Sequence, residues 1–178
     1  MTSNQRERRR ILGSLRSADG VGIVRMEDQF DTDIDDLWAA LTDPRRLARW
    51  YGEVEGDLRL GGEFHLHLPS AGDRTGRVDA CERPRRLALT IRDPDAQPGQ
   101  PDETVIEAGL TADDGRTTLI VEIRGMPLDL IAAYGAGIQI QIEDLGAHIA
   151  GRERVDDEEA RWKALFPAYQ DLAASLSA

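Results

Sequence analysis

LTDPRRLARWYGEVEGDLRLGGEFHL (Leu41–Leu66) joins a short helix to a pair of strands. The Asp43–Pro44 pair is typical of a helix N-terminus, because an aspartate side chain caps free N–H groups and proline suits the first helical position. Gly52 is expected to end this helix in the left-handed conformation. The stretch therefore predicts a brief helix that carries Trp50 and Tyr51 on its last turn.

Strands are expected on both sides of the Gly61-Gly62 pair. Apolar residues stand at alternate positions over Val54–Leu60 and again over Phe64–Leu68, and such alternation is typical of a strand with one buried face. A loop of about three residues would place Phe64 opposite Leu60 and keep both apolar sets on one face. This predicts an antiparallel hairpin directly after the short helix.

The same alternation recurs along most of the chain. Val21–Phe30 is expected to form the first strand, and residues 76–91 form a hairpin around Arg83-Pro84. Residues 106–123 form another hairpin around the Asp-Asp-Gly turn at 113–115, with Ile106, Ala108 and Leu110 facing Ile123, Val121 and Leu119. Antiparallel neighbours with one apolar face predict a sheet that is covered on one side.

Three further segments show helical spacing. Thr32 is expected to cap a helix whose apolar face leads to Leu41. Apolar residues three or four positions apart predict a long helix over residues 128–150, about 35 Å in length at 1.5 Å per residue, which can cross the sheet. The final segment, 162–176, is amphipathic and is expected to break or kink at Pro167. It would pack either on the sheet's outer face or on a second subunit.

Composition narrows the possible partners. The formal net charge of −11 repels a phosphate backbone and anionic lipid, so neither nucleic acid nor a membrane is expected as a partner. No apolar run is long enough to span a bilayer. Cys81 is the only cysteine, which fits a reducing cytoplasm, and its place in the alternation predicts that it points outward near Arg86. The basic run Arg6–Arg10 departs from this charge and is read as a solvated arm, or as a contact for an acidic partner.

Four motifs, in order, resemble one known family. They are LWAALTDPRRLARW (Leu37–Trp50), LRLGGEFHL (Leu58–Leu66), GRVDACERPRRLALT (Gly76–Thr90) and a Gly-Ala-Gly in the last long helix. Together they are similar to the helix-grip superfamily of START-like and birch-pollen-allergen-like proteins (SRPBCC), in the mostly bacterial, polyketide-cyclase-like branch of homologues of the activator of heat-shock-protein-90 ATPase. Relatives often carry Trp where this chain has Ile138 and His where it has Gln141, so the roles of those residues do not transfer.

The resemblance implies an α+β helix-grip fold: a curved antiparallel sheet of about six to seven strands, two short helices after the first strand, a long C-terminal helix across the concave face, and an extra C-terminal helical segment. Residues 1–20 would form a flexible basic arm, 21–150 the helix-grip domain, and 151–178 a helical extension packed on that domain.

The resemblance also implies a cavity between the sheet and the long helix, suited to apolar or amphipathic small molecules. Gly135 and Gly137 lie within that helix and fit either close packing or space for a ligand. Gln141 shares a face with Tyr134 and could orient a ligand carbonyl or hydroxyl, or could instead bond strand-end backbone. The expected ligand-binding residues are Trp50, Phe64, Leu66, Val78, Leu89, Val121, Tyr134, Ile138 and Gln141.

Other chemistry finds less support in the sequence. Glu107 and Glu122 would face each other across a hairpin, but on the face opposite the aliphatic residues, which favours solvent over acid–base work. His65 and His67 also project away from the apolar face and lack a third ligand, so no metal site is expected. Nothing matches a phosphate loop or a dinucleotide fingerprint, so no cofactor is expected.

The leading hypothesis is a soluble protein that binds an apolar small molecule. The alternatives are a cyclase- or hydratase-like enzyme that uses Tyr134 and Gln141 to hold a carbonyl, and a chaperone-linked ATPase activator. A second copy of the chain and a chaperone are the further candidate partners. The sequence does not identify catalytic residues.

Overall fold

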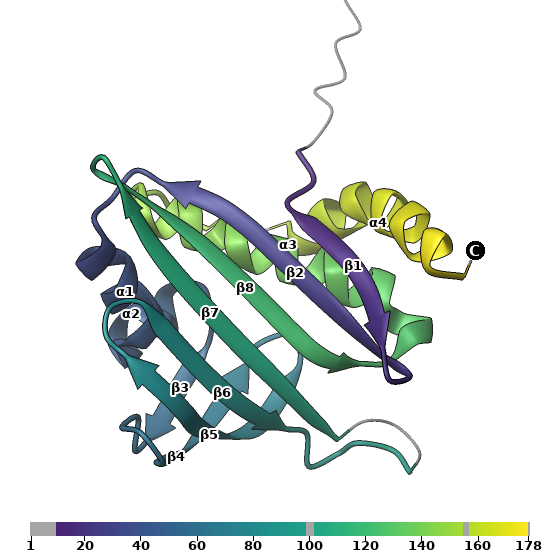
Figure 1. Cartoon of the computed structure of the whole chain (residues 1–178), viewed down its shortest axis with the longest axis horizontal. Coiled ribbons are helices and arrows are strands. Elements are labelled where there is room, and N and C mark those ends of the chain that lie inside the picture. Colours follow the sequence, from purple (N-terminus) through teal and green to yellow (C-terminus); the bar gives the residue numbers. More distant parts are fainter. Residues whose placement is uncertain (1–9, 99–101, 155–156, 178) are drawn as a thin grey trace, which may run out of the picture.

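A single antiparallel sheet of eight strands forms the body of the protein (Figure 1). The computed structural model describes residues 10–98, 102–154 and 157–177. Along the sheet the strands follow the order β1-β2-β8-β7-β6-β5-β4-β3. Their bounds are β1 Gly13–Ala18, β2 Val21–Phe30, β3 Glu53–Gly56, β4 Glu63–Leu68, β5 Gly72–Glu82, β6 Arg86–Arg92, β7 Glu103–Asp113 and β8 Arg116–Met126.

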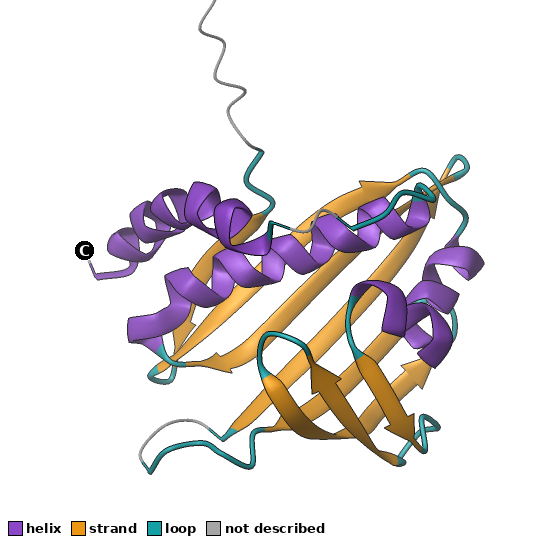
Figure 2. Ribbon diagram, turned by 180° about the vertical axis from the view of Figure 1, so that it is seen from behind, coloured by secondary structure: helices purple, strands orange, loops and turns teal. Residues whose placement is uncertain are grey.

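The helices lie on one side of this sheet (Figure 2). They are α1 Ile34–Thr42, α2 Pro44–Trp50, α3 Ile131–Ile149 and α4 Glu158–Ala174, with short 3-10 turns at Leu128–Leu130 and Ser175–Ser177. The long α3 runs across the sheet, α1 and α2 sit at one end, and α4 packs beside α3 next to β1. The helix-grip fold is therefore confirmed, with one strand more than expected.

Several local predictions are confirmed in register. β2 spans Val21–Phe30, and the Asp43 carboxylate caps α2 by accepting from the Arg45 N–H. In the β7–β8 hairpin Ile106 pairs with Ile123 and Leu110 with Leu119. A turn with positive φ at both central residues, Asp114 and Gly115, closes this hairpin, as its strand twist requires.

Two predicted helix boundaries are wrong. The cap of α1 is Asp33, whose carboxylate accepts from the Asp36 N–H, while Thr32 instead donates its hydroxyl to the Asp36 carboxylate. Gly52 does not adopt a left-handed conformation, since its φ is not positive. A glycine is needed there for a different reason: a Cβ would lie 2.5 Å from the carbonyl oxygen of His67.

The predicted pairing of Leu60 with Phe64 is also wrong. β3 ends at Gly56, which pairs with Phe64, and the Leu60 residue is 67% exposed. The Asp57 carboxylate accepts from both the main-chain N–H and the guanidinium of Arg59, which turns the chain away from the sheet. Asx turns of this kind compete with strand pairing, so the alternation that continues to Leu60 does not extend the strand.

The N-terminal segment is more ordered than the expected arm over residues 1–20. Gly13–Ala18 form β1, an edge strand paired along its length with β2, so the arm prediction is wrong for these residues. The Arg10 guanidinium lies 3.2 Å from the Asp28 carboxylate. The rest of the basic run, Arg6–Arg9, lies outside the described residues.

A β-bulge in β5 changes the direction of Cys81. The register shifts between Val78, which pairs with Leu89, and Ala80, which pairs with Ala88. Because a bulge adds one residue, it reverses the alternation beyond it. Cys81 consequently pairs with Leu87 on the inner face, at an exposed edge, and not outward as its position in the alternation suggests.

The final helix is buried within this chain. α4 contacts α3 and β1, and its Leu165 and Tyr169 are fully buried. Trp162 stacks on Phe166 with ring centroids 4.3 Å apart and donates its indole N–H to the Ala133 carbonyl. Helix α4 continues through Pro167, so the helix does not break there. It lies on the side of the sheet that carries the other helices, so the predicted packing on the outer face is wrong, and these contacts account for the aromatic residues that suggested a second subunit.

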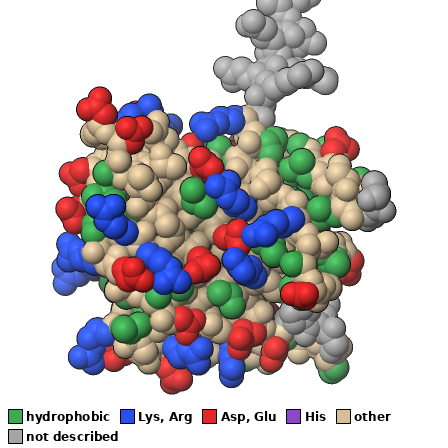
Figure 3. Space-filling view, in the orientation of Figure 1, with side chains coloured by type: hydrophobic (Ala, Val, Ile, Leu, Met, Phe, Trp, Pro, Cys, Tyr) green, Lys and Arg blue, Asp and Glu red, His purple; other side chains and the backbone are tan. Residues whose placement is uncertain are grey.

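The outer face of the sheet is covered by charged side chains of both signs (Figure 3). Glu107 and Glu122 face each other across the β7–β8 hairpin as predicted, but arginines surround them. Arg16 lies 2.7 Å from Glu122, and Arg86 lies 2.8 Å from Glu107. Arg124 contacts both carboxylates. These ion pairs neutralise the two acids and leave them on the face opposite the helices.

Gly76 is expected to be sensitive to substitution, because the Phe64 ring packs directly on it. A Cβ at Gly76 would lie 2.3 Å from a Phe64 ring atom, whereas a Cβ at Gly109 would meet nothing within 4 Å. Gly76→Ala should lower the free energy of unfolding by about 1–3 kcal/mol, and Gly109→Ala should change it by less than about 0.5 kcal/mol. Urea unfolding of both variants tests this, and equal effects would contradict the packing described.

Candidate functional site

A pocket lies between the inner face of the sheet and α3. Its volume is about 400 Å³, and its walls come from α2, β4–β8, the part of α3 from Ala133 to Asp144, and the segment that follows α3. Strand residues that face inward here, such as Ile91 and Ile106, are only partly buried. In a filled core such positions would be closed off completely, so the inner face is hollow over this part of the sheet.

A second, smaller pocket adjoins the first. It measures about 120 Å³ and lies under α1 and α2, with walls from β3–β6 that include Phe64, Val78 and Leu89. Both pockets are lined by Tyr51, Leu66 and Ile91. The two spaces are therefore neighbouring chambers with a common apolar wall.

Trp50 and Tyr51 perform different tasks at this wall. Trp50 is 6% exposed, and its indole N–H donates to the Ala40 carbonyl at 3.1 Å, which ties α2 to α1. Its ring lies 5.3 Å from the Tyr51 ring, centroid to centroid. Within the described chain no group hydrogen-bonds to the Tyr51 hydroxyl, and burial raises the pKa of Tyr51 to about 12. A neutral phenol with a free donor thus stands where the two chambers meet.

The two glycines of α3 have different causes. A Cβ at Gly135 would lie 2.5 Å from the Tyr169 ring, so this glycine allows α4 to pack closely. A Cβ at Gly137 would meet nothing within 4 Å, and Gly137 lines the larger pocket. Close packing therefore explains Gly135, and open space in the pocket explains Gly137.

Two polar side chains of α3 also reach the larger pocket. Tyr134 is 42% exposed and stands where Leu130 and Ala133 line the same opening. Gln141 is half-buried on the pocket wall, and the described residues offer its amide no hydrogen-bond partner. These groups, with the Tyr51 phenol, are available to a bound molecule.

The expected ligand-binding residues divide between the chambers. Trp50, Leu66, Tyr134, Ile138 and Gln141 line the larger pocket. Phe64, Val78 and Leu89 line the smaller one, together with Leu66. Val121 lines neither pocket and packs in the core. Tyr51, which reaches both chambers, was not among the expected residues although it follows Trp50 directly.

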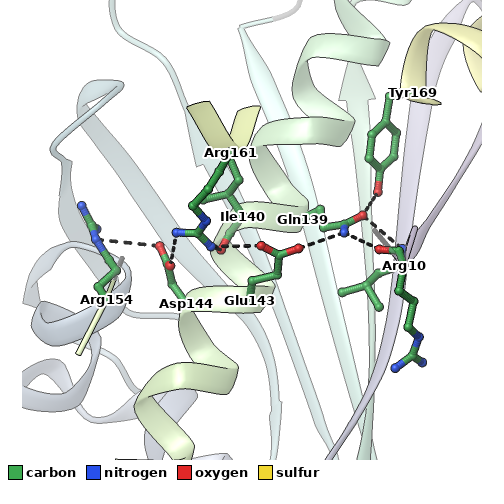
Figure 4. Close-up of polar contacts among 9 residues, drawn as sticks. Arg10, Gln139, Ile140, Glu143, Asp144, Arg154, Arg161 and Tyr169 are labelled. Atoms are coloured by element: carbon green, nitrogen blue, oxygen red, sulfur yellow. Dashed lines mark hydrogen bonds and ion pairs between the residues drawn. The ribbon is translucent and has the colours of Figure 1, made fainter. Parts of the chain in front are cut away.

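Gln139, which the sequence did not single out, is a fully buried polar residue of α3 (Figure 4). Its side-chain oxygen accepts from the Tyr169 hydroxyl at 2.6 Å and from the Leu12 N–H at 3.0 Å. Its NH₂ group donates to the Arg10 carbonyl and to Glu143. One amide therefore joins α3 to α4 and to the segment before β1.

The polar network continues along α3 to the segment beyond it (Figure 4). The Arg161 guanidinium donates to Asp144 at 2.7 Å and to Glu143 at 3.1 Å. Arg154 lies farther from Asp144, at 3.8 Å. Arg161 thus supplies the main counter-charge for the buried Asp144 carboxylate. Burial raises the pKa of Asp144, and the Arg161 guanidinium opposes this shift only in part.

A third pocket, of about 380 Å³, opens at the C-terminal end of α3 and is rich in arginine. Arg49, His148, Arg152 and Arg154 line it, together with Asp144, Gly151 and Glu153. His148 accepts a hydrogen bond from the Arg46 Nε at 3.1 Å, which requires an unprotonated Nε2. Burial, together with the positive charges of Arg46 and Arg49, lowers the pKa of His148.

The other two histidines, His65 and His67, are exposed on β4. His67 contacts the Asp73 carboxylate at 2.7 Å on the outer face. In residues 10–98, 102–154 and 157–177, no group of three or more His, Cys, Asp or Glu side chains is arranged to hold a metal ion.

Comparison with known proteins identifies one family and several related structures. The family model described as activator of Hsp90 ATPase homolog 1-like protein matches residues 31–150. The crystal structure of CalU16 from Micromonospora echinospora is 25% identical, with a TM-score of 0.71, and the match covers 91% of this chain and 96% of that one. No curated protein sequence matches.

Two other structures extend this comparison. DynU16, a protein of the dynemicin biosynthetic locus, is 26% identical, with a TM-score of 0.67, over 78% of this chain and 51% of that one. An HSP90 activator from Plasmodium falciparum is 18% identical, with a TM-score of 0.50, over 60% of this chain and 74% of that one. At that identity the second likeness shows a common fold only.

Gln139 and Gln141, two residues apart on α3, are expected to differ sharply in their effect on stability. Gln139→Leu removes the acceptor of the buried Tyr169 hydroxyl and of the half-buried Leu12 N–H, so it should lower the free energy of unfolding by about 3 kcal/mol. Gln141→Leu breaks no hydrogen bond and should change it by less than about 0.5 kcal/mol. Urea unfolding of the two variants makes the measurement, and a larger loss for Gln141→Leu would contradict the assigned contacts.

Protonation of His148 is expected to destabilise the folded protein. Its pKa in the folded state is lowered from 6.5, so the unfolded chain binds this proton more readily. The stability that depends on neutral His148 is therefore complete above about pH 6.5 and is lost as the pH falls below it. NMR titration should give a His148 midpoint below 6.5, and His148→Gln should weaken the pH dependence of unfolding between pH 7 and 5. A midpoint above 6.5 would contradict this environment.

Proposed function

This chain belongs to the family of activator of Hsp90 ATPase homolog 1-like proteins, and we propose that it binds an apolar or amphipathic small molecule in the chambers beneath α3. The observation that carries the proposal is the hollow itself: two adjoining pockets of about 400 and 120 Å³ with a common wall of Tyr51, Leu66 and Ile91. Ligand sites of proteins commonly occupy about 300–1,000 Å³.

The lining supports a mainly apolar ligand with one or two polar groups. Leu66, Ile106 and Ile138 supply apolar surface from both the sheet and α3. The Tyr51 hydroxyl and the Gln141 amide have no protein partner among the described residues, so either can bond a ligand carbonyl or hydroxyl. A few polar groups in an apolar pocket are what fixes the orientation of a ligand.

Catalysis is the second candidate, and Tyr51 is the observation that favours it. With a pKa of about 12, the phenol stays protonated near neutral pH and acts as a donor, not as a base. A donor held in an apolar pocket polarises a carbonyl that accepts its hydrogen bond. In a cyclase- or hydratase-like reaction Tyr51 would be the donor that polarises the substrate carbonyl, and Tyr134 and Gln141 would hold the substrate. DynU16, as a protein of a biosynthetic locus, agrees with such a setting.

Stimulation of a chaperone ATPase is the third candidate, and it rests on the description of the family. It predicts that the purified protein accelerates ATP hydrolysis by a heat-shock ATPase whether or not the chambers are filled.

The net charge bears on the other possible partners. Because the formal charge is −11, nucleic acid and anionic membranes are not proposed as partners. No helix in the described part of the chain is both long and apolar enough to cross a bilayer. We place this function in the cytoplasm, because the chain has a single cysteine, Cys81, and so cannot form the internal disulfides typical of oxidising compartments.

Filling the larger chamber should abolish ligand binding without unfolding the protein. Gly137→Leu places a side chain into open space and also removes a helix glycine, which is worth about 1 kcal/mol. The variant should therefore be at least as stable as the parent. Its affinity for N-phenyl-1-naphthylamine, a neutral apolar fluorophore, should fall at least about tenfold, measured by fluorescence titration.

Gly146→Ala is the matched control for this variant. It lies on the same helix, where a Cβ would make only an ordinary contact with Phe30 at 3.7 Å, and it gains the same helix propensity. Fluorophore binding should be unchanged. The proposal fails if the parent protein binds neither the fluorophore nor any small molecule retained through native mass spectrometry, or if Gly137→Leu binds as tightly as the parent.

A further inference from the structure

The larger chamber and the arginine-rich pocket meet at two residues. Asp144 and Arg154 line both spaces. Along α3, Tyr134, Gly137, Gln141, Asp144 and His148 follow one another at intervals of three or four residues, so they lie on one side of the helix. This side leads from the apolar chamber, past the unpaired amide of Gln141, to the pocket at the C-terminal end of the helix.

The arginines at this end have few competing partners. In the part of the chain that the structure describes, Arg49 and Arg152 form no ion pair or side-chain hydrogen bond, and Arg154 has only the 3.8 Å approach to Asp144. Most other arginines of this acidic protein are paired, as on the outer face of the sheet. Unpaired arginines that share a pocket are suited to an anionic group.

Most carboxylates near these arginines are stabilised by other groups and do not need the arginines as partners. Arg161 lies 2.7 Å from Asp144, so Asp144 keeps a counter-charge if Arg154 turns to a ligand. Glu158 lies in the first turn of α4, where the helix dipole stabilises a negative charge. Glu153 is the remaining carboxylate of the pocket, against three arginines. The lowered pKa of His148 agrees with a positive local potential.

We propose that the ligand of this protein is an amphipathic anion, whose apolar body fills the chamber beneath α3 and whose charged end lies against Arg49, Arg152 and Arg154. This inference rests on the proposed binding function and specifies the chemical class of the ligand. The overall charge of −11 does not oppose it strongly, because exposed charges beyond about 8 Å are largely screened at physiological salt.

A series of ligands that differ only in the head group tests the assignment. Displacement of N-phenyl-1-naphthylamine is measured with dodecanol, dodecanoate and dodecyl phosphate, all below their micelle concentrations. Dodecanoate or dodecyl phosphate should bind about tenfold more tightly than dodecanol, and the comparison of the two identifies the preferred anion. Raising the salt concentration should reduce this preference and leave dodecanol unaffected.

Variants assign the preference to the arginines. Arg49→Gln and Arg152→Gln should each reduce the affinity for the anion several-fold and leave that for dodecanol unchanged. Arg45→Gln is the control, because it removes an exposed arginine from the same helix as Arg49 but outside the pocket. It should change neither affinity.

The outcomes separate this inference from the function on which it rests. If the fluorophore and dodecanol bind but neither anion binds more tightly, the inference is overturned and the binding function stands. If Arg45→Gln weakens anion binding as much as Arg49→Gln, the effect is one of overall charge and the assigned site is wrong. If nothing binds, the proposed function itself fails.

Discussion

The position of α3 at one side of the sheet is the constraint on which the rest of the structure depends. Among the strands, α3 packs most closely on β2, at one side of the sheet, and α4 and β1 hold it there. Gln139 fastens this arrangement through its bonds to Tyr169 and to the main chain before β1. Because the helix lies to one side, α3 does not cover the inner face over β4–β7, and the space between this face and the helices forms the chambers.

Much of the fold could be predicted because the apolar alternation is strict. The β7–β8 hairpin has the predicted register, since its turn and its apolar face agree. The prediction failed where a side chain bonds its own backbone or where a bulge intervenes. At Leu60 the Asp57 turn ends the strand, and at Cys81 the bulge after Val78 reverses the alternation. Neither event changes the apolar pattern, so the pattern does not reveal them.

The candidate site was predicted less completely, for reasons of geometry. Gln139 and Gln141 both stand in the helical stripe, and only their position relative to α4 and β1 distinguishes a structural amide from one facing the cavity. β1 itself has a weak strand pattern and looks like part of a basic arm. Trp50 joins α2 to α1, and the neighbouring Tyr51 faces the pockets. The periodicity of the sequence does not distinguish these two roles. These distinctions arise from tertiary contacts.

The position of Tyr51 between the chambers has a consequence for the shape of what can bind. A rigid, flat molecule can occupy the larger chamber alone, with its edge against the phenol. A molecule that filled both chambers would have to pass the common wall of Tyr51, Leu66 and Ile91. Under the proposed binding function, the flexibility of a ligand as well as its polarity would then decide whether it reaches the smaller chamber.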